Sequence, residues 1–421
     1  MTDSVRSLRK GADDKKKPGK EVESVQPIML LAPGMGRSRP DKFTQGADVT
    51  VRPVAAPALL LSRRALVGTA MALGALPSRI LAQETGQLIA GTYAQEGGPG
   101  LVPLVASPSG WVAGRPLDTI RNASFGVQAS ANGVRYLLDE QEKGRVGVYD
   151  RGLRRLGDFS TRGADPCHAA LSPDGGMLAV ANYSSGSVAI WRIDRATGRP
   201  MGEAQLAIHT GEGPNRARQA GPHAHWVGFA MGGKLLHSVD LGADAIFAHL
   251  LDPQSGAILS TSLAYRAPAG SGPRHLARHP RLRIAYLVSE LANTVTVLAV
   301  HPDGTFAAKE IRSTLPAEFS GPSTAAHIAV NKSGTRLYVS NRGHDSIAVF
   351  AIGAHGGLKL LQHVGSGGRG PRLFLLIEER GEMLVANQRS GNVSRLRLGK
   401  DGRLGAAEFG TAIPGVVFLS T

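Results

Sequence analysis

Short apolar runs separated by turn residues recur along the chain from residue 122 onward. Residues 272–304 show the plan: an apolar run, a turn, a second run at 284–288, a polar break, and a β-branched run at 294–300 that ends in a Pro-Asp-Gly turn. Short runs of this kind, bounded by Gly, Pro, Asn and Asp, are typical of β-strands. A fourth, more variable run follows, so each copy predicts four short strands.

Six copies of this plan follow one another at a steady interval. A polar residue after the second apolar run marks each copy, and successive markers lie 42, 58, 50, 51 and 46 residues apart. The markers are Glu140, Asn182, Asp240, Glu290, Asn341 and Asn387. Four short strands at a period of roughly 40–50 residues indicate the blade of a β-propeller.

Two remnants flank the six copies, at 86–106 and 410–421. Neither is a blade alone. Together they predict a seventh blade, in which strands from both termini close the ring and remove exposed sheet edges. The sequence therefore predicts an all-β, seven-bladed β-propeller of four-stranded blades in one domain, residues 84–421. Two separate β-sandwiches are the alternative, and the even period through the middle of the chain argues against them.

The first 82 residues differ from the repeats in composition. Residues 1–60 are polar, basic and aperiodic, and we expect them to be disordered or an untranslated extension. In 61–82, Arg63 and Arg64 directly precede an apolar stretch of about 12 residues, too short to span a bilayer. This layout predicts a twin-arginine signal peptide, the twin-arginine translocon as a partner during export, a periplasmic protein and no stable membrane anchor. A short amphipathic helix in a cytoplasmic protein is the alternative.

Charge and cysteine content narrow the classes of function. The chain has 48 Lys and Arg against 33 Asp and Glu, but after residue 82 the numbers are 34 and 26, spread evenly. No basic block with interleaved aromatic residues occurs there, so we expect no nucleic-acid partner, whereas an anionic small ligand fits. The single cysteine, Cys167, excludes an internal disulfide and any CxxC motif. The sequence also lacks a serine-nucleophile elbow, an HExxH motif and a P-loop.

The repeat predicts which polar residues meet. In a blade, the first two strands are antiparallel and joined by a hairpin, so the start of the first and the end of the second lie on the same side of the ring. Charged groups there must pair or line a pocket, because burying them alone is costly. Residues at starts of first strands are His168, His223, Arg274, His275 and Arg372. Residues at ends of second strands are Glu140, Asp240, Glu290, Asn341, Arg342 and Gln388.

Two groups of these residues are interpreted differently. Asn182, Asn341 and Asn387 fill the same repeat position, and we interpret them as polar caps of the blades. The residues that depart from the repeat and fall on adjacent copies are interpreted as functional; they are His223, Arg274, Glu290 and Arg342.

Several sequence pieces carry a family resemblance: GPHAHWV, SVDLGAD, GPRHLARHP, AYLVSELANTVTV, LYVSNRGHDSIAVF, GPRLF and MLVANQRSGNV. In their order and spacing, residues 86–421 resemble the seven-bladed lactonases that include the propeller-type 6-phosphogluconolactonase and the fungal carboxy-muconate cyclase. The resemblance implies a seven-bladed propeller that hydrolyses a sugar lactone without a metal or other cofactor. It carries the family's proposed site residues over to His223, Arg274, Glu290 and Arg342.

The chain departs from the family pattern at one position. The string AAHI places His327 where the family usually has an acidic residue, which leaves the contacts of that blade open. The residues expected to bind substrate are His225, Asp240, His275, His327, Arg372 and Gln388.

The expected chemistry is attack of a deprotonated water on the lactone carbonyl. Glu290 or His223 is the expected base, and Arg274 and Arg342 are expected to stabilise the oxyanion or bind a carboxylate or phosphate. Export favours an unphosphorylated sugar lactone or another lactone as the substrate. We expect the protein to be a monomer. A non-catalytic exported propeller that binds a protein or glycan, and a muconate-type lactone-forming cyclase, are the alternatives.

Overall fold

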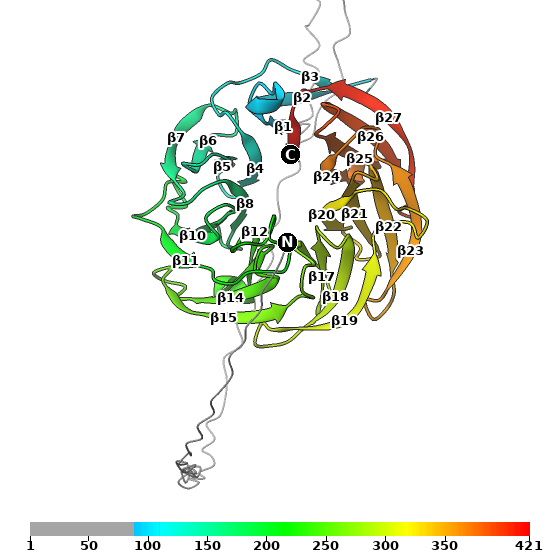
Figure 1. Cartoon of the computed structure of the whole chain (residues 1–421). Helices are drawn as coiled ribbons and strands as arrows, with labels where there is room; N and C mark the ends of the chain where they lie inside the picture. Colours follow the sequence, from blue (N-terminus) through cyan, green and yellow to red (C-terminus); the bar gives the residue numbers. More distant parts are fainter. Residues whose placement is uncertain (1–87, 109) are drawn as a thin grey trace, which may run out of the picture. The chain divides into compact units, whose positions relative to one another are not determined.

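The computed structural model describes residues 88–421 except residue 109, and these residues form 28 β-strands and three short 3₁₀-helices. Figure 1 shows the strands as seven sheets arranged around a central axis. Each sheet has four antiparallel strands. The predicted all-β, seven-bladed propeller is confirmed.

The blades are numbered in chain order, each from its innermost strand outwards. Blade 1 consists of β28 (Val416–Ser420), β1 (Leu88–Thr92), β2 (Leu101–Ser107) and β3 (Gly110–Ala113). Blade 2 consists of β4 (Ala123–Gln128), β5 (Arg135–Asp139), β6 (Arg145–Tyr149) and β7 (Arg155–Ser160). Blade 3 consists of β8 (Pro166–Leu171), β9 (Met177–Asn182), β10 (Ser187–Arg192) and β11 (Gln205–Ile208).

The remaining blades follow the same order. They are blade 4, β12 (Ala224–Ala230), β13 (Leu235–Asp240), β14 (Ala245–Leu251) and β15 (Ile258–Arg266); blade 5, β16 (Pro273–Arg278), β17 (Ile284–Ser289), β18 (Thr294–Val300) and β19 (Phe306–Ser313); blade 6, β20 (Thr324–Val330), β21 (Arg336–Arg342), β22 (Ser346–Ile352) and β23 (Leu358–Gly365); and blade 7, β24 (Pro371–Ile377), β25 (Glu382–Asn387), β26 (Asn392–Leu398) and β27 (Leu404–Ala412). The 3₁₀-helices are η1 (Ala94–Glu96), η2 (Met231–Gly233) and η3 (Glu378–Arg380).

Both ends of the described chain build blade 1. The C-terminal strand β28 is innermost and pairs antiparallel with β1, with Ala90 opposite Leu419. It also contacts β4 and β24, the innermost strands of the two neighbouring blades. The remnants at the two ends therefore form the seventh blade and close the ring, as predicted, and no innermost strand is left without neighbours.

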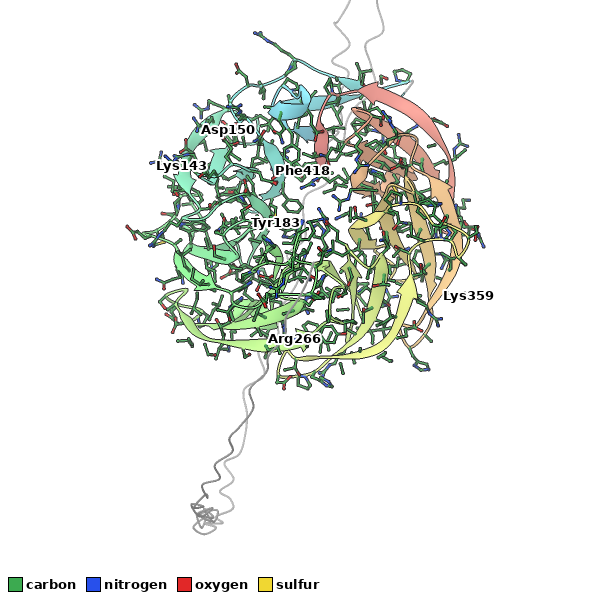
Figure 2. All side chains as sticks on the ribbon, in the orientation of Figure 1. Lys143, Asp150, Tyr183, Arg266, Lys359 and Phe418 are labelled. Atoms are coloured by element: carbon green, nitrogen blue, oxygen red, sulfur yellow. The ribbon has the colours of Figure 1, made fainter. Side chains whose placement is uncertain are left out.

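The hydrophobic core lies between neighbouring blades. Tyr286 and Val297 of blade 5, for example, pack in one cluster with Val339 and Phe350 of blade 6. All six residues of β17 are buried, because a blade covers each face of this strand. Apolar runs without strict alternation are expected for strands buried on both faces. Figure 2 shows Tyr183 close to the axis, whereas Lys143 and Lys359 lie at the outer edge.

Asparagines in the repeat cap the blades from within. Asn341 is fully buried; its amide donates to the Thr314 carbonyl at 2.8 Å and its oxygen accepts from the Thr314 hydroxyl at 2.7 Å. Asn182 and Asn387 donate to the corresponding carbonyls of Thr161 and Ser366. Each of these bonds ties the second strand of one blade to the residue that follows the fourth strand of the preceding blade. The interpretation of these asparagines as polar caps agrees with their contacts.

Candidate active site

A β-bulge at the start of the innermost strands turns selected side chains out of the regular pattern. In blade 5, Pro273 pairs with Ser289 and His275 pairs with Val288, which leaves Arg274 as the extra residue. An extra residue of this kind re-aims a side chain that would otherwise point into the sheet. The extra residues of blades 2, 3, 4 and 7 are Ser124, Cys167, His225 and Arg372. In blade 6, Ala326 and His327 together lie opposite the single residue Ser340.

A second set of side chains follows the second strands directly. Glu290 comes one residue after Ser289, and its backbone N–H donates to the Gly272 carbonyl at 2.7 Å. The residues in the same position of the other six blades are Tyr93, Glu140, Tyr183, Leu241, Arg342 and Gln388. The sequence markers Asn182, Asp240, Asn341 and Asn387 lie one residue earlier. Because a shift of one residue moves a side chain to the other side, those four point into the blades.

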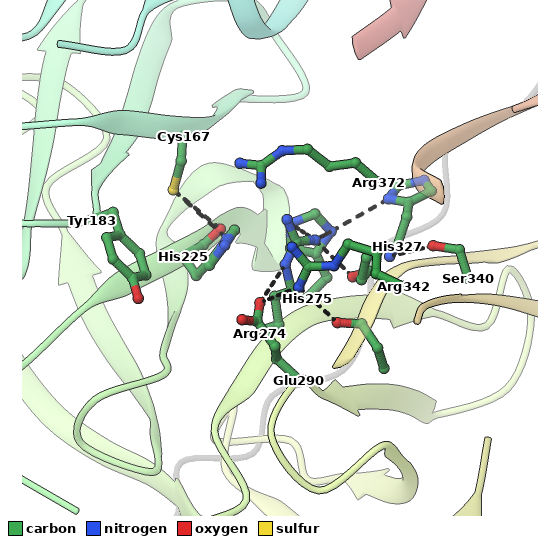
Figure 3. A network of polar contacts seen from close by, with 12 residues as sticks. Cys167, Tyr183, His225, Arg274, His275, Glu290, His327, Ser340, Arg342 and Arg372 are labelled. Carbon is green, nitrogen blue, oxygen red and sulfur yellow. Dashed lines mark hydrogen bonds and ion pairs between the residues drawn. The ribbon is translucent and has the colours of Figure 1, made fainter. Parts of the chain in front are cut away.

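Side chains from both sets line a pocket of about 280 Å³ (Figure 3). A third contribution comes from the segment after β1 and from the loop between β11 and β12. The pocket is lined by Tyr93, Gln95, Glu140, Cys167, Tyr183, Arg218, His225, Glu290, Arg342 and Arg372. Of the residues predicted from sequence, the structure thus brings Glu290, Arg342, His225 and Arg372 to one pocket.

Glu290 is held by three guanidinium groups. Arg218 donates to Oε1 at 2.7 Å, while Arg274 Nε and Arg342 Nη2 lie 3.0 and 2.8 Å from Oε2. The Glu290 side chain is 4% exposed and that of Arg274 is 3% exposed. Burial alone would raise the pKa of Glu290, but Arg342 and Arg274 outweigh it and hold this pKa well below its usual range. The group is therefore a fixed anion and a weak proton acceptor.

Glu140 stands in the same position of blade 2 with different neighbours. Its Oε2 accepts from the Tyr93 hydroxyl at 2.8 Å, and the nearest guanidinium, Arg372 Nη2, is 4.0 Å from Oε2. Arg372 donates instead to the Tyr93 oxygen at 2.8 Å, with its guanidinium 5.2 Å from the centre of the Tyr93 ring. Burial raises the pKa of Glu140, and Arg372 offsets this only in part.

The wall between the two carboxylates carries His225, Cys167 and Tyr183. Burial lowers the pKa of His225 well below its usual value, so this imidazole is neutral near pH 7. Burial raises the pKa of the Cys167 thiol, so this cysteine is not a thiolate nucleophile. Its sulfur lies 3.7 Å from His225 Nδ1.

Three further histidines lie next to His225 on neighbouring innermost strands. The ring centres of His168 and His225 are each 5.2 Å from that of His275, and His327 is 5.5 Å from it. Arg274 Nη1 donates to His275 Nε2 at 3.1 Å, and His275 Nδ1 is 3.3 Å from His327 Nδ1. Burial lowers the pKa of His275 well below its usual value and that of His327 to about 3. His275 and His327 thus support Arg274 from behind rather than line the pocket.

His223 lies beside the pocket, not in its lining. Its ring stacks on Tyr183 with 4.5 Å between centres, and its Nδ1 is 3.1 Å from the Tyr183 carbonyl oxygen. Leu241 N–H donates to the His223 carbonyl, just as Glu290 N–H donates to that of Gly272. His223 therefore matches Gly272, and His225 is the counterpart of Arg274. Aligning the sequence piece GPH with GPR pairs His223 with Arg274, which is two residues away from its structural counterpart, Gly272.

Asp240 and Gln388 do not face the pocket either. Asp240 is fully buried; its Oδ1 accepts from the backbone N–H groups of His223 and Ala243, both at 2.8 Å, and its Oδ2 is 2.7 Å from His209 Nδ1. Gln388 donates to Glu96 Oε1 at 2.6 Å outside the pocket. Both residues belong to the framework around the site.

Five lining residues are not among the predicted site residues: Tyr93, Gln95, Cys167, Tyr183 and Arg218. Glu140 is predicted only as a strand end. Tyr183 and Glu140 could have been found from the strand register, since they hold the same position as Glu290. Arg218 sits in the loop between β11 and β12, where the sequence has no repeat to compare. In the part of the chain that the structure describes, no group of three or more His, Cys, Asp or Glu side chains is arranged to hold a metal ion.

Comparison with known proteins agrees with this architecture. The family described as "Lactonase, 7-bladed beta-propeller" matches residues 87–420. The chain belongs to this family. A 6-phosphogluconolactonase of Bacillus subtilis is 31% identical over 327 residues, which cover 75% of this chain and 92% of that protein. The family and this relative support lactone hydrolysis as the class of reaction.

Solved structures place the family fold over most of the chain. The periplasmic gluconolactonase of Pseudomonas aeruginosa is 27% identical and superposes with a TM-score of 0.73, covering 79% of this chain and 98% of the other. A protein of Lactobacillus plantarum is 25% identical with the same TM-score and coverage. Among residues 88–108 and 110–421, no helix is long and apolar enough to cross a membrane.

Proposed function

We propose that this protein hydrolyses a sugar lactone in the pocket between Glu290 and Glu140. The observation that carries the proposal is the Glu290 carboxylate with its three guanidinium groups at the pocket wall, in a chain of the lactonase family. One carboxylate balances only one of three positive charges. The wall therefore keeps a net positive charge next to the pocket, where negative charge develops during ester hydrolysis.

The arginines are the proposed oxyanion donors. Arg342 and Arg218 line the pocket, and their remaining N–H groups can receive the carbonyl oxygen of the lactone as it becomes an alkoxide. Glu290 fixes the guanidinium planes, so that no reorganisation is needed when the charge appears. Arg274 holds Glu290 from the buried side and has its own pKa lowered to about 9 by burial and by Arg342. This gives Glu290 the role of holding the arginines in place rather than that of the base.

Gluconolactone and its 6-phosphate are the proposed substrates to compare. The Bacillus subtilis relative is named for the phosphorylated lactone and the Pseudomonas aeruginosa structure for a gluconolactone. We favour the unphosphorylated lactone, because the sequence predicts export. Arg218 and Arg372 at the pocket could nevertheless bind a phosphate, so the two compounds have to be tested side by side.

A pH-stat assay with both lactones, with spontaneous hydrolysis subtracted, tests the proposal. We expect acceleration of at least one lactone, and a loss of about 10²–10³ in kcat/KM for Arg342→Ala, as for removal of an oxyanion donor. Arg154→Ala is the matched control, because this side chain is 79% exposed at the surface. No acceleration of either lactone by the folded wild-type protein would contradict the proposal and favour a binding role.

We also propose that residues 61–82 direct export through the twin-arginine route, from the Arg63-Arg64 pair before the apolar stretch. These residues lie outside the described part of the chain. Fractionation of cells expressing the full chain should place the product in the periplasm, and replacing both arginines by lysine should retain it in the cytoplasm. N-terminal sequencing of the exported product should give a start near residue 83; an uncleaved cytoplasmic product from the unaltered chain would refute the proposal.

A further inference from the structure

The pocket contains two carboxylates in equivalent positions on opposite sides of the ring. Glu140 follows the second strand of blade 2 and Glu290 follows the second strand of blade 5, so the two are three blades apart by one way round the ring and four by the other. Both side chains line the same pocket. A lactone bound between them would have the Glu290 arginines on one side and Glu140 on the other.

The two carboxylates differ in the donors that they accept. Three guanidinium nitrogens lie within 3.0 Å of Glu290, and an ion pair of this kind stabilises the charged form. Glu140 accepts from a neutral phenol at 2.8 Å, and its nearest guanidinium nitrogen is 4.0 Å away. A buried carboxylate with a neutral donor is a better proton acceptor than one paired with several guanidinium groups, and pairs of acids with opposed environments divide the roles in acid–base catalysis. The raised pKa of Glu140 agrees with this contrast.

A short hydrogen-bond chain fixes the orientation of Glu140. Arg372 donates to the Tyr93 oxygen, so the Tyr93 proton is directed to Glu140 Oε2. The chain draws one residue from each of blades 7, 1 and 2. Tyr93 is 6% exposed and is held by its backbone N–H on the Gly415 carbonyl at 2.8 Å. The carboxylate is thus preorganised at the pocket wall by this hydrogen-bond chain.

We propose that Glu140 is the general base of the lactone hydrolysis, an inference that rests on the proposed function. Glu140 takes a proton from a water molecule as the water oxygen bonds to the lactone carbonyl carbon, and the carbonyl electron pair moves to its oxygen beside the Glu290 arginines. When the tetrahedral intermediate collapses, the bond from the carbonyl carbon to the ring oxygen breaks. Glu140 returns the proton to that ring oxygen, which gives the open hydroxy acid with no further reactant.

The test compares wild type, Glu140→Gln, Glu140→Ala and Tyr93→Phe, with the exposed Glu203→Gln as matched control. Glu140→Gln keeps the shape but accepts no proton, so kcat should fall by about 10²–10⁴ with little change in KM. The acid limb of the wild-type kcat/KM profile, set by the Glu140 ionisation, should be missing. Tyr93→Phe should shift this limb to higher pH, because the carboxylate loses a donor. Added formate should restore part of the activity of Glu140→Ala.

The outcomes separate the two proposals. A wild-type protein that accelerates no lactone overturns the proposed function and this inference with it. A wild-type lactonase whose Glu140→Gln variant keeps its rate and its acid limb overturns the assignment of Glu140 alone. If Glu140→Gln does not fold, as judged by its circular dichroism, the acid limb of Tyr93→Phe decides: an unshifted limb refutes the role of Glu140.

Discussion

Replacing Glu290 by glutamine should destabilise the fold as well as the site. Among the described residues, the substitution removes the only carboxylate paired with Arg218, Arg274 and Arg342, and it leaves three positive charges close together. Removing one partner of a buried ion pair costs about 3–5 kcal/mol. Arg218 is more exposed, with 38% of its side chain accessible, so most of this cost comes from Arg274 and Arg342.

The expected shift in Tm follows from the size of the propeller. At about 2.1 cal/mol/K per residue, unfolding of the described residues carries an entropy of about 0.7 kcal/mol/K. A loss of 3–5 kcal/mol therefore lowers Tm by roughly 4–7 °C at pH 7. Differential scanning calorimetry at a fixed scan rate measures this shift, with Glu203→Gln as the control at an exposed pair.

The pH dependence of the shift has a defined sign. The pKa of Glu290 is depressed in the folded state, so its contribution to stability is fully present above the unfolded value of about 4.3 and is lost as pH falls towards the folded pKa. The difference in Tm between wild type and Glu290→Gln should be constant from pH 7 to about pH 5.5 and shrink below that. Equal Tm values at pH 7, or a difference that grows on acidification, would refute the reasoning.

Three further predictions follow from buried groups. Asp240→Asn should lower the free energy of unfolding, measured by urea titration, by about 1–3 kcal/mol and leave kcat within about threefold of wild type. Asp240 accepts from two backbone N–H groups and contacts His209, but it does not line the pocket. A large loss of kcat at unchanged stability would contradict this. Cys167→Ala should keep lactonase activity, and iodoacetamide should not inactivate the wild type at pH 8, since burial keeps the thiol protonated. The pKa of His327 is depressed in the folded state, so its contribution to stability is present above about pH 6.5 and is lost as pH falls through about 3. His327→Gln should therefore reduce the fall of Tm between pH 6.5 and pH 4. An unchanged slope of Tm against pH would exclude His327 as a cause of the acid destabilisation.

The fold could be predicted because the repeat is carried by apolar residues. Each blade needs the same buried runs, and the two remnants had only one way to complete a ring, so the pairing of β1 with β28 followed from strand counting. Arg274, Glu290 and Arg342 stood out because they break the repeat, and the structure does bring them together.

The errors at the site have one physical origin. Which side chain faces the pocket depends on strand register and on the bulges, and neither can be seen in a pattern of apolar runs. The sequence predicts His223 and Asp240 at the mouth of the central channel. In the structure, His225 is the extra residue of the bulge in blade 4, and Leu241 holds the position that corresponds to Glu290. Arg218 comes from a loop without a repeat, and Tyr93 comes from the remnant before the first copy, so comparing copies could identify neither of them.

The closure of blade 1 has a consequence for how activity arises during synthesis. β28, Val416–Ser420, is the last strand in the described part of the chain, so the inner neighbour of β1 is absent until these residues have been synthesised. Tyr93 follows β1 and is tied to Gly415 just before β28, and it links Arg372 to Glu140 across the seam of the ring. A product that ends before Gly415 would lose the anchor of Tyr93 along with β28. Turnover would then report translation through β28, and a frameshift just before the codon for Gly415 would abolish activity while sparing every residue that lines the pocket.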